Sequence, residues 1–209
     1  MDLSFFRIKR LKVDLHWLVI AVLLPSCVIG FYLFFLDGSI SYGSRALLES
    51  NIAFALKLAL VSGITEELFF RGYIMKIVES KWDKGVAILV PSIIFACLHG
   101  FRGIREGDFL QLLIAGTIVG IMFSLITYVG DNIWNAVVVH IVWNLLVLGV
   151  FNISTTSNYK SIINYSYESN NMMITGGQFG IEAGAPAIIG YLTIIGFTLV
   201  TEYKRNQTQ

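Results

Sequence analysis

The chain has 209 residues, of which 56% are hydrophobic and only 14% are charged. Soluble domains carry about 25% charged residues, so this composition excludes an ordinary soluble protein and indicates an integral membrane protein. The formal net charge is +1 and the basic residues form no patch, which gives no reason to expect a nucleic-acid partner.

Six apolar stretches follow one another along the chain, and a membrane-spanning helix needs about 20 such residues. They cover residues 15–36, 52–79, 85–101, 109–129, 132–151 and 185–203. The sequence therefore predicts an all-α integral membrane protein with a bundle of about six transmembrane helices and an intramembrane polar site. Residues 1–209 are expected to make a single polytopic membrane domain. Residues 152–183 are rich in Asn, Ser, Thr, Tyr and Gly and are predicted to form an outer loop.

The basic residues are distributed unevenly between the two membrane sides that alternating spans create. One side receives Arg7, Lys9, Arg10, Lys12, Lys76, Lys81, Lys84, Lys204 and Arg205, and the other receives Arg45, Arg102, Arg105 and Lys160. Because positively charged residues collect on the cytoplasmic side, both termini are predicted to lie in the cytoplasm. We expect a multi-pass protein of the plasma membrane.

The fourth apolar stretch contains the sequence GTIVG, with Gly116 and Gly120 four residues apart. This spacing of small residues lets two membrane helices approach closely. Ordinary packing in a Gly-rich membrane chain explains these glycines equally well.

Three ionisable residues interrupt the second apolar stretch, in the sequence EELFFRG that begins at Glu66. A charge in the middle of a membrane helix is expensive, so such residues are paired or functional. Glu67 and Arg71 are four residues apart and can form an ion pair on one helix face. Glu66 lies about 140° away from Arg71, on a narrow stripe with Ser62 and Tyr73. The cluster is predicted to contain one structural pair and one unpaired carboxylate.

Two other apolar stretches carry polar residues at a similar depth. The third contains FACLH, with Phe95 one turn before His99, and the fifth contains HIVWN, with His140 and Asn144 on one face. At 1.5 Å per residue, these polar side chains and Glu66 lie roughly 14–22 Å from the same membrane side. They are therefore predicted to converge on one pocket.

Such a pocket is suited to hydrolysis of an amide without a serine or cysteine nucleophile. A carboxylate, Glu66, and one imidazole can deprotonate and orient a water molecule. The second imidazole and an Asn amide can donate hydrogen bonds to the oxyanion. No cofactor is expected. A zinc ion held by Glu66, His99 and His140 remains an alternative, although the sequence lacks HExxH.

With these motifs in order, the chain resembles the family of type II CAAX prenyl endopeptidases and bacteriocin-processing proteases, also called CPBP or Abi membrane proteins. The resemblance covers residues 50–150 and is carried by EELFFR, FACLH and HIVWN. It implies an intramembrane glutamic-type endopeptidase that acts on a membrane-associated protein or peptide. Eukaryotic members remove three residues after a prenylated cysteine, and bacterial members process peptides or confer self-immunity.

The resemblance also implies roles for individual residues. Glu66 activates the water with help from His99, and His140 and Asn144 stabilise the oxyanion. The supporting residues are Glu67, Arg71 and Phe95.

Two other classes of protein fit the polar cluster. A non-catalytic scaffold, immunity or regulatory protein would keep Glu67 and Arg71 for structure but would not need Glu66. A small transporter or proton relay would also place ionisable groups at mid-depth, but the sequence shows no inverted repeat. The expected partners are the lipid bilayer and a membrane-associated substrate, and no oligomeric state follows from the sequence.

Overall fold

The computed structural model is mostly helical over the part of the chain that it describes. That part comprises residues 3–43, 48–100, 106–155 and 161–207. Within it, three helices are long and apolar enough to cross a membrane: α1 (Leu15–Phe35), α5 (Glu106–Gly130) and α8 (Ala185–Gln207). These findings confirm a helical membrane protein, and the three helices occupy the predicted first, fourth and sixth stretches.

The predicted second stretch is a helix that changes type along its length. α2 (Leu48–Glu67) continues into a π-helix, η3 (Leu68–Ile74), and then into α3 (Met75–Glu79). The π-helical turns begin immediately after the two adjacent glutamates and contain Arg71. The residues of the EELFFRG sequence therefore lie where the helical repeat changes, which alters the faces on which later side chains lie.

The remaining two predicted stretches form shorter apolar helices. α4 spans Lys84–Gly100, and α6 (Trp134–Asn144) continues into a second π-helix, η4 (Leu145–Val150). Helices thus stand at all six predicted places. Whether α2, α4 and α6 cross the bilayer remains a prediction.

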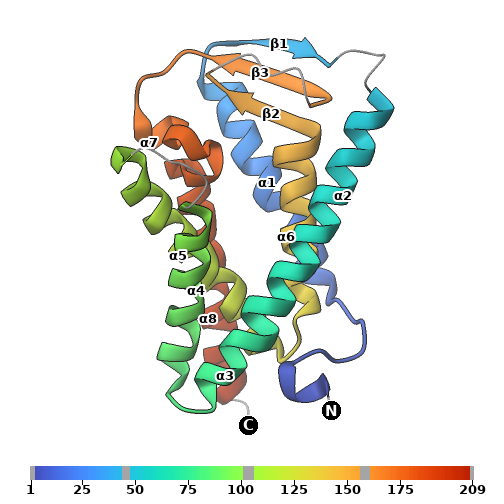
Figure 1. Cartoon of the computed structure of the whole chain (residues 1–209), viewed down its shortest axis with the longest axis vertical. Coiled ribbons are helices and arrows are strands. Elements are labelled where there is room, and N and C mark those ends of the chain that lie inside the picture. The colour runs from blue at the N-terminus through green and yellow to red at the C-terminus, as the bar shows by residue number, and fades with distance from the viewer. Residues whose placement is uncertain (1–2, 44–47, 101–105, 156–160, 208–209) are drawn as a thin grey trace.

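The helices lie side by side along the long axis of the molecule, with a small sheet at one end (Figure 1). Both termini lie at the opposite end. We call these the sheet end and the terminal end. A buried apolar cluster ties α1, α5, α6 and α8 together, and its large members include Trp17, Tyr32, Ile126, Trp143 and Tyr191.

Small residues set the distances between the helices that carry the motifs. A Cβ atom on Gly63 of α2 would lie 2.6 Å from Cγ1 of Ile141 on α6, so the two helices touch there. Likewise, Cβ atoms on Gly116 and Gly120 of α5 would lie 2.9 Å and 2.7 Å from the side chains of Ala96 and Ser92 on α4. The close helix approach that GTIVG permits is therefore present between α4 and α5.

The sheet end contains three strands that the sequence analysis missed. β1 (Gly38–Tyr42) and β2 (Phe151–Ser154) are the edge strands, and β3 (Ile163–Tyr167) lies between them. β1 pairs with β3 antiparallel and β2 pairs with β3 in parallel. Because the partners are up to about 130 residues apart in the chain, no local pattern reveals the pairing.

The described part of the predicted outer loop, residues 152–155 and 161–183, therefore contains regular secondary structure. After the strands it forms α7 (Met172–Thr175) and two short 3-10 helices, η5 (Gly177–Phe179) and η6 (Ile181–Ala183). These lead directly into α8.

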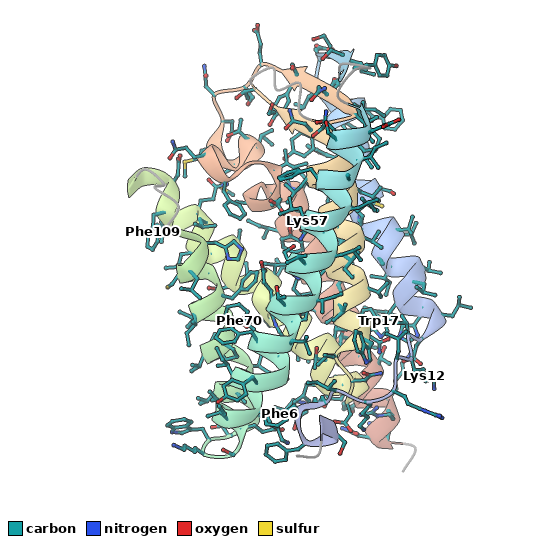
Figure 2. The ribbon with its side chains drawn as sticks, turned by 45° about the vertical axis from the view of Figure 1, so that its right-hand side comes forward. Phe6, Lys12, Trp17, Lys57, Phe70 and Phe109 are labelled. Atoms are coloured by element: carbon teal, nitrogen blue, oxygen red, sulfur yellow. The ribbon has the colours of Figure 1, made fainter. Side chains whose placement is uncertain are left out.

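At the terminal end, ion pairs connect the N-terminal segment to the helix ends. Arg7 is 5% exposed, and its Nη2 donates to Oε1 of Glu79 at 2.8 Å while its Nε lies 3.3 Å from Oδ1 of Asp131. Lys9 also pairs with Asp131. Figure 2 shows Phe6 and Lys12 at this end, beside the ends of the helices.

The basic residues predicted for the opposite membrane side, Arg45, Arg102, Arg105 and Lys160, lie outside the described residues. The orientation of the termini in the membrane remains a prediction.

Candidate active site

A cavity of about 440 Å³ lies among α2, α4, α5, α6 and the turn that precedes α8. Apolar side chains form much of its wall. Its polar side chains include Ser62, Glu66, His99, His140, Asn144, Gln178 and Glu182. The four residues that were predicted to converge therefore surround one space.

The ion pair predicted between Glu67 and Arg71 is present, and both side chains are fully buried. Nη1 of Arg71 donates to Oε1 of Glu67 at 3.0 Å, and Nη2 donates to the backbone oxygen of Gly120 at 3.0 Å. Cζ of Arg71 lies 4.9 Å and 5.3 Å from the ring centroids of Phe95 and Phe123. Pairing and aromatic contact together offset the desolvation of the two charges.

His140 bridges the two glutamates, which the sequence analysis did not predict. Its Nδ1 lies 2.8 Å from Oε1 of Glu67, and its Nε2 lies 3.8 Å from Oε2 of Glu66. An ionised carboxylate only accepts hydrogen bonds, so Nδ1 carries a proton and donates a hydrogen bond to Glu67. Phe123 stacks on the imidazole at 4.8 Å and 14°. Glu67 thus orients His140 in addition to pairing with Arg71.

The two adjacent glutamates have different environments. The side chain of Glu67 is 0% exposed, whereas that of Glu66 is 23% exposed and lines the cavity. Successive residues on a helix point about 100° apart, which accounts for the difference. Glu66 is therefore the carboxylate that a water molecule in the cavity can reach.

Asn144 is oriented by Ser62 across the contact between α2 and α6. The Ser62 hydroxyl donates to the backbone oxygen of Leu58 at 2.8 Å, and its oxygen lies 2.7 Å from Nδ2 of Asn144. Because the single hydroxyl proton is used on Leu58, Ser62 can only accept from Asn144. The amide group of Asn144 is thereby fixed with its nitrogen toward Ser62.

His99 enters the cavity wall from α4. Its Nδ1 lies 2.8 Å from the backbone oxygen of Phe95, one turn earlier, and the two rings are 4.4 Å apart. A carbonyl oxygen only accepts, so Nδ1 of His99 carries the proton of this hydrogen bond.

Tyr73 was expected on the same stripe as Glu66, and this prediction was wrong. Tyr73 is 50% exposed and stacks on Phe6 at 5.9 Å, and it is not among the residues around the cavity. The π-helix η3 forms i→i+5 hydrogen bonds, which rotate the residues after Glu67 away from their α-helical positions. The prediction had assumed an uninterrupted α-helix.

Three cavity residues were missed because they follow the sheet: Gln178, Phe179 and Glu182. Nε1 of Trp143 on α6 donates to Oε1 of Glu182 at 2.7 Å, which connects this turn to the motif-bearing helices. All three residues belong to the predicted outer loop, residues 152–183. The only signal of a tight turn here is the repeated glycine around them.

The geometry was also tested for a metal. Over the described part of the chain, no group of three or more His, Cys, Asp or Glu side chains is arranged to hold a metal ion. The Nδ1 atoms of His99 and His140 donate to Phe95 and Glu67, so a zinc ion would have to bind the Nε2 atoms.

A segment of the chain matches a known protein family. Residues 48–146 match the family described as Rce1-like, type II CAAX prenyl endopeptidase. The matched segment contains EELFFR, FACLH and HIVWN, and its two ends fall at the start of α2 and within η4. Neither the curated proteins nor the solved structures include a match to this chain.

Proposed function

Because residues 48–146 match the Rce1-like family of type II CAAX prenyl endopeptidases, we propose that this chain is a glutamic-type intramembrane endopeptidase of that family. It hydrolyses a peptide bond in a membrane-associated protein or peptide. The observation that carries this proposal is the cavity that joins a solvent-accessible Glu66 to His99, His140 and Asn144.

In the proposed reaction, Glu66 removes a proton from a water molecule whose oxygen attacks the carbonyl carbon of the scissile bond. The carbonyl π-electrons move to the oxygen and form an oxyanion. When the tetrahedral intermediate collapses, the carbon–nitrogen bond breaks and the leaving nitrogen takes the proton from Glu66. The products are a carboxylic acid and an amine, so no external reactant besides water is needed.

His99 assists by accepting a hydrogen bond from the attacking water at Nε2, since its Nδ1–H is directed to Phe95. Asn144 stabilises the oxyanion with its amide group. His140 contributes Nε2, which donates to the oxyanion when that nitrogen carries a proton. The proton that Glu66 takes from the water moves to this nitrogen, 3.8 Å away, in the intermediate and returns through Glu66 to the leaving nitrogen on collapse.

Glu67 and Arg71 act as positioning residues in this proposal. Glu67 holds Nδ1 of His140, and Arg71 holds Glu67 and the backbone of α5 at Gly120. A group held by two partners loses little freedom when the substrate binds, which favours a preorganised site.

We further propose that α2, α4 and α6 cross the bilayer together with the three longer helices. The chain would then span the plasma membrane six times, with the terminal end in the cytoplasm. The basic residues of that end support this orientation.

The function is tested by comparing the peptides of membranes from cells that carry the intact protein or the Glu66→Gln form. We expect peptides that accumulate only with the intact protein, at equal membrane levels of the two forms. Glu49→Gln is the matched control, because it changes a carboxylate in the first turn of the same helix that is not among the residues around the cavity. A scaffold or immunity protein would give identical peptide profiles for intact and Glu66→Gln forms.

We propose that the reaction needs no metal. The test is the cleavage rate of the purified protein after treatment with a chelator, with and without added zinc. An unchanged rate is expected. A rate lost to the chelator and restored by zinc would instead support zinc at Glu66, His99 and His140.

A further inference from the structure

The turn between the sheet and α8 forms one wall of the cavity, although it lies outside the segment that matches the family. Residues 176–184 contribute Gln178, Phe179 and Glu182 to this wall. Part of the cavity wall on α5 is formed by the small residues Ala115 and Gly116. Of the three residues from the turn, Phe179 is the one that brings an aromatic ring to the wall.

Hydrogen bonds from the surrounding helices fix this turn. Nε2 of Gln111 donates to the backbone oxygen of Met172 at 2.8 Å, before the turn, and to that of Ala183 at 2.7 Å, near the end of the turn. The backbone nitrogen of Gln178 donates to Oδ2 of Asp108 at 3.0 Å. The wall is therefore held by α5, and it also receives the bond from Trp143 to Glu182.

The backbone of the turn requires glycine on both sides of Phe179. Gly177 has φ of 62° and Gly180 has φ of 94°, in the left-handed region that residues with a Cβ atom avoid. These two glycines let the chain reverse sharply, so that the ring of Phe179 reaches His99. The ring centroids are 6.0 Å apart, with the planes at 79°.

Phe179 is thus a half-buried ring that lines the cavity and contacts a proposed catalytic imidazole. A substrate whose scissile bond lies between Glu66 and His99 must place one of its adjoining side chains near this ring. Steric exclusion by one wall residue is a common source of protease specificity, because a close-packed wall cannot absorb extra volume cheaply.

We propose that Phe179 is a specificity-determining residue that excludes large aromatic side chains next to the scissile bond. The inference rests on the proposed endopeptidase function. The preferred substrates have small or unbranched apolar side chains there, and substitution of Phe179 by a smaller residue admits aromatic ones.

The test uses purified full-length protein and internally quenched peptides that end in a farnesylated cysteine followed by three residues. One set varies the residue after the cleaved bond among Ala, Leu, Phe and Trp, and an unprenylated set varies the residue before it in the same way. The readout is the ratio of kcat/KM for the Trp and Ala peptides within one preparation. This ratio does not depend on how much of the protein is folded.

We expect Phe179→Ala to raise the Trp-to-Ala ratio by about tenfold or more in one of the two sets. Phe179→Leu should raise it less, and Phe179→Trp should lower it. Phe34→Ala is the matched control, because Phe34 is 86% exposed on α1 and is not among the residues around the cavity. The Trp-to-Ala ratio of this variant should equal that of the intact protein. If Phe179→Ala is poorly folded, the Trp-to-Ala ratio of Phe179→Leu is used in its place.

The outcomes separate the two proposals. Cleavage that depends on Glu66, with the same ratio in the intact protein and in all Phe179 variants, would overturn the role of Phe179 alone. Absence of any Glu66-dependent cleavage of both peptide sets and in membranes would overturn the endopeptidase function and this inference with it.

Discussion

The helices that carry the three motifs and the segment that closes the cavity are held together by different interactions. Between α2 and α6, buried ionic and polar groups meet across a contact made possible by Gly63. In the closing segment, residues 171–184, single neutral side chains such as Tyr32 and Gln111 bind backbone oxygens. Removal of Glu67 leaves a fully buried, unpaired charge in the first region, whereas removal of the Tyr32 hydroxyl or the Gln111 amide leaves only unsatisfied neutral groups in the second. The first region should therefore be far more sensitive to substitution.

The largest expected effect is the loss of activity in Glu66→Gln. Removal of a general base slows catalysis by about 10²–10⁴-fold, while the side chain keeps its size. Because Glu66 is 23% exposed and carries no buried partner charge comparable to Arg71, the melting temperature should stay close to that of the intact protein. The measurements are single-turnover cleavage of a quenched prenylated peptide and thermal unfolding in detergent. Retained activity would show that another group activates the water.

The next effect is loss of stability in Glu67→Ala. This change leaves Arg71 buried without its carboxylate and His140 without its acceptor, which should cost about 3–5 kcal/mol. The free energy of unfolding in mild detergent and the abundance in membranes report it. Glu49→Ala is the control at a glutamate in the first turn of the same helix, and it should change neither. Equal stability of Glu67→Ala and the intact protein would contradict the account of the buried pair.

A smaller effect is expected for Gly63→Ala. The added methyl group would lie 2.6 Å from Cγ1 of Ile141 and 3.1 Å from its backbone nitrogen, so α2 and α6 must separate. Such overpacking costs about 1–3 kcal/mol, and the separation should lower kcat as well. Gly196→Ala in α8 meets no atom within 4 Å and should leave stability unchanged or raise it slightly. Equal stability of Gly63→Ala and Gly196→Ala would contradict the close contact between α2 and α6.

The smallest effect is expected in the closing segment. Tyr32→Phe removes the hydroxyl that donates to the backbone oxygen of Ile174 at 2.5 Å, a loss of about 0.5–1.5 kcal/mol. Limited proteolysis between the sheet and α8 should become faster, with little change in the cleavage activity. A destabilisation as large as that of Glu67→Ala would mean that the two regions are not held differently.

Several features of the site could be predicted from the sequence because they depend on local spacing. The i,i+4 separation of Glu67 and Arg71 was sufficient to predict their ion pair. Equal depth along separate helices was sufficient to place Glu66 and His140 beside one space. Helix positions also followed from the lengths of the apolar stretches.

Other features depend on contacts or conformations that no local pattern records. Tyr73 was misplaced because the π-helical turns change the repeat after Glu67. The strands were missed because β1 and β3 come together from distant parts of the chain. For the same reason Phe179 was left in a loop, although folding brings its ring to His99.

The central claim is that α2 and α6 pack in the register that places both glutamates beside His140. A disulfide tests it directly, in membranes, in a Cys27→Ala, Cys97→Ala background with Gly63→Cys and Ile141→Cys. The account predicts rapid cross-linking of this pair on mild oxidation, because the two positions are in contact, and little cross-linking of Gly63→Cys with Leu148→Cys, about two helical turns away. Cross-linking of the displaced pair in preference to the first would contradict the account.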